Sequence, residues 1–301
     1  MFARPLPLLL RNTSFTVREG RRRGVSRSRM RGRDLVRPTR SLRVPRVVPL
    51  DTVELRARAY RPLLGANQWF SHTTAAALWG LALPARLRDE PVLHVTGANG
   101  RQMRRPGVVG HRTRSVPRIG TAAGLPTSDP LRTWLDCAAV LSVRELTVMG
   151  DQLIERWCSL DDLRVAVSRA GGIRGITRLR AAVELVRPGS ESPMESALRL
   201  VLVDHGLPEP ECNLDVRGSD GRFLGRVDLA YPELRIAIEY EGRHHQEDRA
   251  TYLRDIARRE RFEAERWAFV LVTDGDLVDE RRLVDRVRRR RAERSSDAQR
   301  V

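Results

Sequence analysis

The chain has 301 residues and a formal net charge of +17, from 55 basic and 38 acidic residues. Every basic residue is arginine, and the absence of lysine excludes Schiff-base chemistry, a phosphate-binding-loop lysine and lysine general bases. Three separated cysteines exclude a disulfide framework. No segment approaches the roughly 20 apolar residues that span a bilayer, so we expect a cytoplasmic protein of two or three domains with no membrane partner.

The positive charge is concentrated at the beginning of the chain. The first 60 residues hold 16 arginines and four acidic residues, whereas residues 191–301 hold 21 arginines and 24 acidic residues. A basic N-terminal third attracts polyanions such as DNA. A C-terminal third with a surplus of carboxylates does not, unless those carboxylates hold metal.

The first 50 residues contain two short helical segments and a hairpin. Helices are expected over Thr16–Arg23 and Ser26–Arg31, each beginning at a capping residue and ending at a glycine. Short strands over Leu35–Arg37 and Ser41–Val44 would form the hairpin. This order predicts a winged-helix DNA-binding region over residues 1–50, with the hairpin as the wing. A disordered basic arm is the alternative.

Two groups of arginines are candidate DNA contacts. One lies on the second short helix, where arginine can bond guanine bidentately. The other lies in a loop between two expected strands, Leu93–Thr96 and Val108–His111, where it could touch phosphates. A solvated hairpin tip explains this loop equally well. The candidate DNA-binding residues are Arg27, Arg29, Arg31, Arg104 and Arg105.

The stretch GVSRSRMRGRDLVRPTRSLRVP resembles the N-terminal winged-helix segment of actinobacterial proteins related to AbiEi-type antitoxins. The similarity continues through FSHTTAAALWGLALP, LHVTGANGRQMRRPGVVGHR and GLPTSDPLRTWLDCAAVL. This resemblance implies an AbiEi-like mixed α/β middle region over residues 51–188. For an antitoxin-like member it also implies a toxin protein as partner.

Three histidines of the middle region, His72, His94 and His111, lack the spacing of a metal-binding motif. We interpret them as structural or surface residues. The segment Pro188-Gly189-Ser190 is the strongest linker signal in the chain, and we place a domain boundary there.

After this linker, residues 190–294 are predicted to follow the order αβββαβα. The first helix has Ser192 as its cap and Glu195 at its third position. The expected elements are a helix to His205, strands over Cys212–Arg217, Phe223–Ala230 and Leu234–Glu241, a helix over Gln246–Glu265, a strand over Trp267–Thr273 and a helix over Asp274–Arg294. Residues 295–301 are expected to be a disordered tail. The predicted fold class is α/β, of the α+β type.

Three carboxylates are expected to converge on neighbouring strands of this domain. Glu239 and Glu241 are two residues apart on the third strand and therefore share a face. A tight hairpin would bring Asp228 of the second strand beside them. Oxygen ligands of this kind suit Mg²⁺, with Mn²⁺ as the alternative ion. A bound magnesium ion could polarise a phosphodiester and lower the pKa of a water molecule.

The segments ESPMESALRLVL, GRVDLAYPELRIAIEYEGRHH and RRERFEAERWAFVLVT resemble the PD-(D/E)XK, or restriction-endonuclease-like, superfamily, and most closely its very-short-patch-repair branch. This resemblance implies that Asp228 and Glu239 bind metal, with help from Glu195. It also implies a catalytic role for the downstream His244 and His245. The sequence departs from the pattern because Glu241 stands where the family usually has lysine, and Val227 replaces a proline.

Two functions therefore stand side by side. The first is a metal-dependent DNA endonuclease, in which Asp228 and Glu239 hold the metal and Glu241 positions or deprotonates water. The second is a non-catalytic, antitoxin-like DNA-binding regulator that retains a nuclease-like scaffold, which the missing lysine favours. RNA remains open as a substrate, although the basic region shows no aromatic stacking platform.

Overall fold

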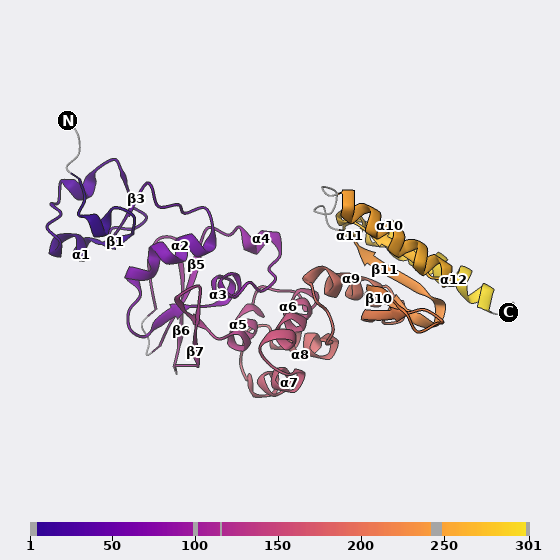
Figure 1. The fold of residues 1–301 in the computed structure, drawn as a ribbon. Coiled ribbons are helices and arrows are strands. Elements are labelled where there is room, and N and C mark those ends of the chain that lie inside the picture. The colour runs from indigo at the N-terminus through magenta and orange to yellow at the C-terminus, as the bar shows by residue number, and fades with distance from the viewer. Residues whose placement is uncertain (1–4, 99–101, 115, 242–248, 299–301) are drawn as a thin grey trace. The chain divides into compact units, whose positions relative to one another are not determined.

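The protein has a mixed α/β fold that divides into two compact units, as the predicted fold class requires. The computed structural model describes residues 5–98, 102–114, 116–241 and 249–298 (Figure 1). One unit comprises Met1–Met149 and Asp161–Ala181, and the other comprises Gly150–Leu160 and Ala182–Val301. The boundary expected at residues 188–190 lies inside the second unit. No helix in the described ranges has the length and apolar character needed to cross a membrane.

The first unit begins with a three-stranded antiparallel sheet, in the order β1-β3-β2. Its strands are β1 (Phe15–Thr16), β2 (Leu35–Val36) and β3 (Leu42–Pro45). The predicted first helix is confirmed as α1 (Val17–Arg22), and the Thr16 side chain accepts a hydrogen bond from the Glu19 N–H. The predicted hairpin is confirmed as the pair β2 and β3.

The helix predicted over Ser26–Arg31 is wrong in type. The chain forms a turn and then a single 3-10 turn, η2 (Arg29–Arg31), and another 3-10 turn, η1 (Leu8–Leu10), precedes the sheet. The Ser26 hydroxyl accepts the Arg29 N–H at 3.2 Å, which is the predicted capping bond. The segment between Gly24 and Gly32 is too short to repay the cost of helix nucleation.

A five-stranded sheet forms the middle of the first unit, in the order β6-β5-β4-β8-β7. Its strands are β4 (Gln68–Phe70), β5 (Leu93–Ala98), β6 (Val108–Thr113), β7 (Ile119–Ala122) and β8 (Leu125–Ser128). The associated helices are α2 (Val53–Tyr60), η3 (Arg61–Leu63), α3 (His72–Trp79) and α4 (Ala85–Arg88). Strands β5 and β6 pair in parallel, so the alternative of a simple hairpin tip between them is wrong.

Helices then lead to the second unit. They are α5 (Pro130–Cys137), α6 (Val143–Arg156), α7 (Leu160–Arg169) and α8 (Ile176–Leu185). Helix α6 contains the boundary between the units, because its residues from Gly150 onward belong to the second unit.

The second unit follows the predicted order αβββαβα, which confirms the order of elements. The elements are α9 (Pro193–Asp204), β9 (Glu211–Arg217), β10 (Phe223–Tyr231), η4 (Pro232–Leu234), β11 (Ile236–Tyr240), α10 (Arg249–Ala264), β12 (Ala268–Val272), α11 (Asp274–Val278) and α12 (Glu280–Ala298). The closing helix is divided near Asp279, and α12 extends through residues expected to be a disordered tail.

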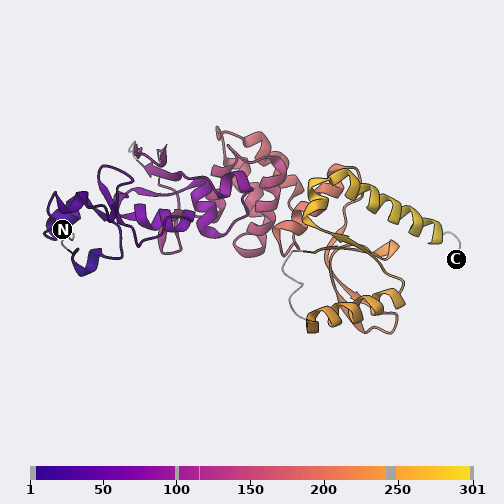
Figure 2. The same cartoon turned by 90° about the horizontal axis from the view of Figure 1, so that it is seen from above.

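Helices cover both faces of the sheet in the second unit, whose strand order is β12-β11-β10-β9. On one face, apolar residues of α9 and α12 pack against Leu229, Ile236 and Ile238. On the other face lies α10 (Figure 2), whose Phe262 belongs to one buried apolar cluster with Ala237. Strand β11 is antiparallel to β10 and parallel to β12. Strand β11 is an inner strand of the sheet, so the residues near its end have a neighbouring strand on each side.

A buried ion pair holds α9 to the end of α6 within the second unit. The Arg199 guanidinium, 1% exposed, donates to the Asp151 carboxylate at 2.9 Å, and Asp151 is fully buried. Arg199 also donates to Glu209 at 2.7 Å, and the Arg187 N–H donates to Asp151 at 2.8 Å. A buried carboxylate without such partners would be strongly destabilising.

Candidate functional site

Asp228 and Glu239 lie on neighbouring antiparallel strands. Leu229 of β10 pairs with Ile238 of β11, so Asp228 and Glu239 occupy the next positions along the two strands. The Asp228 carboxylate accepts the backbone N–H of Tyr240 at 2.8 Å. The structure therefore places these two predicted carboxylates close together, where the ladder between β10 and β11 ends.

The negative charge of Asp228 is only partly compensated. Burial, together with the negative charges of Glu195 and Glu239, raises the pKa of this carboxyl to about 6. The hydrogen bond from Tyr240 and the charge of Arg258 act in the opposite direction. Asp228 is thus an acid that would gain from a nearby cation.

Glu195 is buried near the beginning of α9. Its backbone N–H donates to the Ser192 hydroxyl at 3.2 Å, as the predicted cap requires. Its carboxylate accepts the Glu191 N–H at 2.8 Å and the Asn213 side-chain amide at 2.6 Å. These bonds hold the Glu195 carboxylate in place, and its negative charge contributes to the raised pKa of Asp228.

Arginines of α10 neutralise the two glutamates of β11. Arg258 donates through two nitrogens to both oxygens of Glu239, whose side chain is only 14% exposed. The Arg258 guanidinium also lies 5.0 Å from the centre of the Phe262 ring, which fixes its position. Glu241 is exposed and pairs with Arg259.

These contacts separate the predicted carboxylates into two groups. The charges of Glu195 and Glu239 both act on Asp228, whereas Glu241 faces solvent with an arginine partner. The predicted catalytic residues His244 and His245 lie outside the described residues.

The predicted DNA-binding residues near the hairpin differ in exposure. Arg27 and Arg31 are exposed. Arg29 forms a bidentate pair with Asp34, with N–O distances of 2.9 and 2.6 Å, and this pair lowers the pKa of the Asp34 carboxyl. Arg29 therefore has a structural partner, and Arg27 and Arg31 are the residues that present charge to solvent.

A basic cavity of about 560 Å³ lies beside β6 in the first unit. Arg104 is exposed there, and Arg105 donates to the Ser41 hydroxyl at 2.6 Å, which ties the loop to the N-terminal sheet. The cavity is lined by Leu63, Gln68, Gln102, Met103, Arg104, Arg105 and Arg112. Guanidinium and amide donors in one hollow suit phosphate oxygens.

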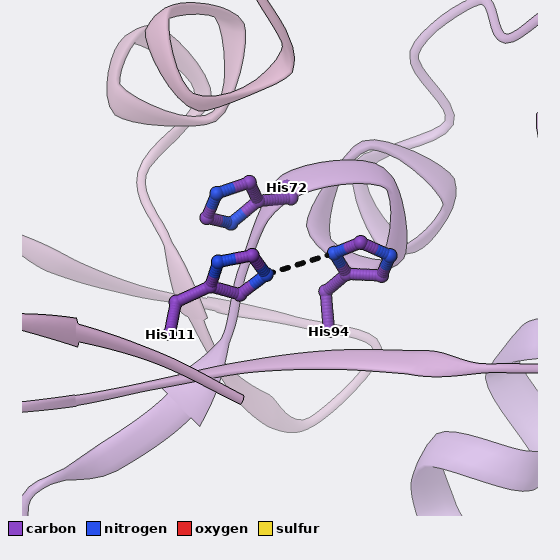
Figure 3. Close-up of side chains that lie close together, drawn as sticks. All are labelled: His72, His94 and His111. Atoms are coloured by element: carbon purple, nitrogen blue, oxygen red, sulfur yellow. Dashed lines mark hydrogen bonds between the residues drawn. The ribbon is translucent and has the colours of Figure 1, made fainter. Parts of the chain in front are cut away.

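Sequence reasoning missed a cluster of three histidines in the first unit. His72 begins α3, His94 lies on β5 and His111 lies on β6, and their rings face one another (Figure 3). One ring nitrogen from each lies within 4.8 Å of the others. Within the described residues, these three side chains form the one group of three potential ligands that lie close enough together to share a metal ion. Pairing of β5 with β6 creates the cluster, and no local sequence pattern reveals it.

Hydrogen bonds fasten the beginning of α3 onto β5 and so place His72 over the sheet. The Ser71 N–H donates to the His94 carbonyl at 3.0 Å, and the His94 N–H donates to the Thr74 hydroxyl at 2.8 Å. His72 adopts a left-handed backbone with φ of 53°, a strained conformation for this residue type. The His72 and His111 rings stack with centroids 3.6 Å apart.

Comparison with known proteins identifies two mycobacterial relatives. They are uncharacterized protein Rv2248 of Mycobacterium tuberculosis (strain ATCC 25618 / H37Rv) and uncharacterized protein MT2308 of strain CDC 1551 / Oshkosh. Each is 31% identical to this chain over 218 residues, which cover 72% of this chain and 78% of the relative. The chain therefore belongs to the same family as these proteins. No protein-family model and no solved structure matches it.

Proposed function

We propose that the protein is a metal-dependent DNA endonuclease of the PD-(D/E)XK type. The observation that carries this proposal is the half-buried Asp228, which lies beside Glu239 and within the electrostatic reach of Glu195. The αβββαβα order of the second unit and the sequence resemblance support the same interpretation. We retain a cytoplasmic location as part of this proposal.

The carboxylates fit a magnesium ion by their chemistry. Asp228 and Glu239 offer oxygen ligands from paired strands, and the charge of Asp228 is disfavoured by burial and by the charges of Glu195 and Glu239. A hard dication would relieve that cost. Asp228 and Glu239 would hold Mg²⁺, or Mn²⁺, and Glu195 would assist. The bound ion would supply phosphodiester polarisation and a lowered pKa of water.

Arg258 supplies the positive charge that lysine supplies in the resembling superfamily. Its guanidinium is held by the Phe262 ring and by Glu239, so it is a fixed cation beside the carboxylates. A fixed donor can stabilise negative charge that develops on a phosphate. Glu241 is solvent-accessible and accepts a bond from Arg259, so its role in this proposal is to orient or deprotonate water.

The first unit would bind the DNA backbone. Arg27, Arg31 and Arg104 are exposed, and Arg104 lines the basic cavity with Arg105 and Arg112. Neutralisation of phosphates by such side chains releases counterions, so affinity should fall as salt rises.

The test is cleavage of duplex, mismatched and single-stranded DNA by the full chain with Mg²⁺ or Mn²⁺. We expect cutting of at least one substrate, its loss with chelator, and its loss in Asp228→Ala. Asp215→Ala, which changes an exposed acid of β9, is the matched control and should cut normally. Undiminished cutting by Asp228→Ala would overturn the site, and no cutting of any substrate would overturn the function.

One observation favours a second function, that of a non-catalytic DNA-binding regulator. Glu239 and Glu241 are both already neutralised by arginines. An antitoxin-like regulator would use the basic first unit and leave the carboxylates as scaffold, with a toxin protein as partner. Sequence-specific operator binding without Mg²⁺ affinity would favour this function.

A further inference from the structure

Ring nitrogens of the three histidines of the first unit lie close to one another. The His94 Nδ1 and His111 Nε2 atoms are 3.0 Å apart and face inward (Figure 3). The His72 Nδ1 lies 3.0 Å from the Ser71 hydroxyl. The buried Nε2 of His94 has no hydrogen-bond partner within 3.5 Å among the described residues.

Carboxylates lie near ring nitrogens of two of these histidines. The Asp136 Oδ2 atom is 3.8 Å from the His72 Nδ1, and the Glu90 Oε2 atom is 3.7 Å from the His94 Nε2. Asp136 is itself held by Arg132, whose Nε donates at 2.8 Å. An imidazole with one nitrogen turned inward and a carboxylate near the other is the usual environment of a metal-bound histidine.

We propose that His72, His94 and His111 form a binding site for one Zn²⁺ ion. Imidazole nitrogens favour zinc and similar transition metals over magnesium, which prefers oxygen. Three histidines leave a fourth position of a tetrahedral ion for water or another ligand. This site is separate from the carboxylates of the second unit, and its existence does not depend on nuclease activity.

The distances are compatible with this ion after small side-chain rotations. Zinc–nitrogen bonds of about 2.0–2.1 Å place neighbouring ligand nitrogens of a tetrahedron about 3.4 Å apart. The inward nitrogens of His94 and His111 are already 3.0 Å apart. The widest separation in the cluster is at most 4.8 Å, so the nitrogens need to approach by about 1.4 Å or less. Because imidazole lone pairs lie in the ring plane, the His72 ring must also turn out of its stack on His111.

The protonation state of the cluster supports metal binding. Burial lowers the pKa of His94 to about 4, and burial together with the neighbouring His94 imidazole lowers the pKa of His111 to about 4. Burial and the two other histidines lower the pKa of His72 to about 2. Neutral imidazoles are the form that binds metal, so no proton has to be displaced near neutral pH.

A metal ion here would fasten α3 to β6, the edge strand of the five-stranded sheet. Arg112, the residue after His111, lines the basic cavity together with Arg104 and Arg105. Binding of the ion should therefore stabilise the first unit and fix the strand that carries part of the basic cavity.

The experiment uses the full chain, stripped with chelator, with Zn²⁺ measured by calorimetry and Co²⁺ by its visible absorption. His244→Ala/His245→Ala serves as background, because these two imidazoles could bind metal themselves. We expect one tight ion per chain, a Co²⁺ spectrum typical of tetrahedral coordination, and a higher unfolding temperature with Zn²⁺.

The diagnostic variants are His72→Gln and His111→Gln, which keep polar side chains at half-buried positions. Each should lower Zn²⁺ affinity at least about 100-fold, and Asp136→Asn about 10–100-fold. His205→Gln, at the end of α9, is the control and should bind normally. Retained binding in both histidine variants, or no tight site in the background protein, would overturn the proposal. Metal-free unfolding temperatures establish whether each variant is folded.

Discussion

The buried carboxylates of the second unit and the buried histidines of the first unit differ in charge and in how they are paired. Asp228 remains a disfavoured charge, and Glu239 beside it is neutralised by Arg258. The histidines are neutral, and His94 and His111 share a hydrogen bond while His72 stacks on His111. The two units therefore offer different ligands: carboxylate oxygens, which suit a hard cation such as Mg²⁺, and imidazole nitrogens, which suit a borderline cation such as Zn²⁺.

We expect the largest loss of stability at Asp151, a buried acid that, unlike Asp228, is paired with an arginine side chain. Arg199→Met removes the guanidinium that compensates Asp151 and should lower the free energy of unfolding by about 3–5 kcal/mol, because a buried charge is left unpaired. Urea unfolding of the full chain measures this. Arg226→Met, which breaks an exposed pair with Asp215, should have a far smaller effect on stability, because water screens an exposed ion pair. Equal effects of the two variants would contradict the role given to Arg199.

Removal of a metal carboxylate should have the next largest effect. Asp228→Ala and Glu239→Gln should each reduce the rate of Mg²⁺-dependent DNA cleavage at least about 100-fold, because ion binding would be lost. Initial rates at saturating DNA measure the change. Glu233→Gln, in the turn before β11, should cut at the wild-type rate. Similar losses in all three variants would indicate damage to the fold instead of the site.

Neutralising Asp228 should also stabilise the metal-free protein. The pKa of its carboxyl is raised from 3.8 to about 6, so stability is lost as pH rises through that range. Asp228→Asn should therefore unfold with a free energy about 1–2 kcal/mol higher than wild type at pH 7.5, with no difference near pH 4. Urea unfolding at both pH values tests this. A variant that is less stable at pH 7.5 would show that the charge is well compensated.

The smallest effect is expected at the basic cavity. Arg104→Ala should weaken DNA binding about 3–10-fold. The slope of log affinity against log salt concentration should fall by about one, as expected for the loss of one phosphate contact. Fluorescence anisotropy with a labelled duplex over a range of salt concentrations measures both. Arg164→Ala, on the exposed face of α7, removes the same charge elsewhere and should leave affinity nearly unchanged. Equal losses would mean that only net charge matters.

Local chemistry made much of the fold predictable. Capping by Thr16 and Ser192, with a glutamate three residues later, identified the beginnings of α1 and α9. Alternation and turn residues identified the hairpin of β10 and β11, and with it the proximity of Asp228 and Glu239. These features depend on residues that are neighbours in sequence, so a single chain contains the necessary information.

Features that depend on distant residues could not be predicted. The parallel pairing of β5 and β6 and the packing of α3 bring His72, His94 and His111 together, although each lies in an unremarkable segment. Two local features were also missed: the bidentate pair of Arg29 with Asp34 occupies a candidate DNA contact, and the segment over Ser26–Arg31, although capped by Ser26, is too short between two glycines to form an α-helix.

Magnesium calorimetry on the full chain is the decisive test of the carboxylate metal site, because it requires no DNA substrate. Mg²⁺ is preferred to Mn²⁺ or Zn²⁺ because the histidine cluster has low affinity for it. We predict binding of Mg²⁺ to wild type and to His72→Gln, and none to the Asp228→Ala/Glu239→Ala variant. Identical heats for wild type and the double-alanine variant would contradict the assignment of these carboxylates as the metal site.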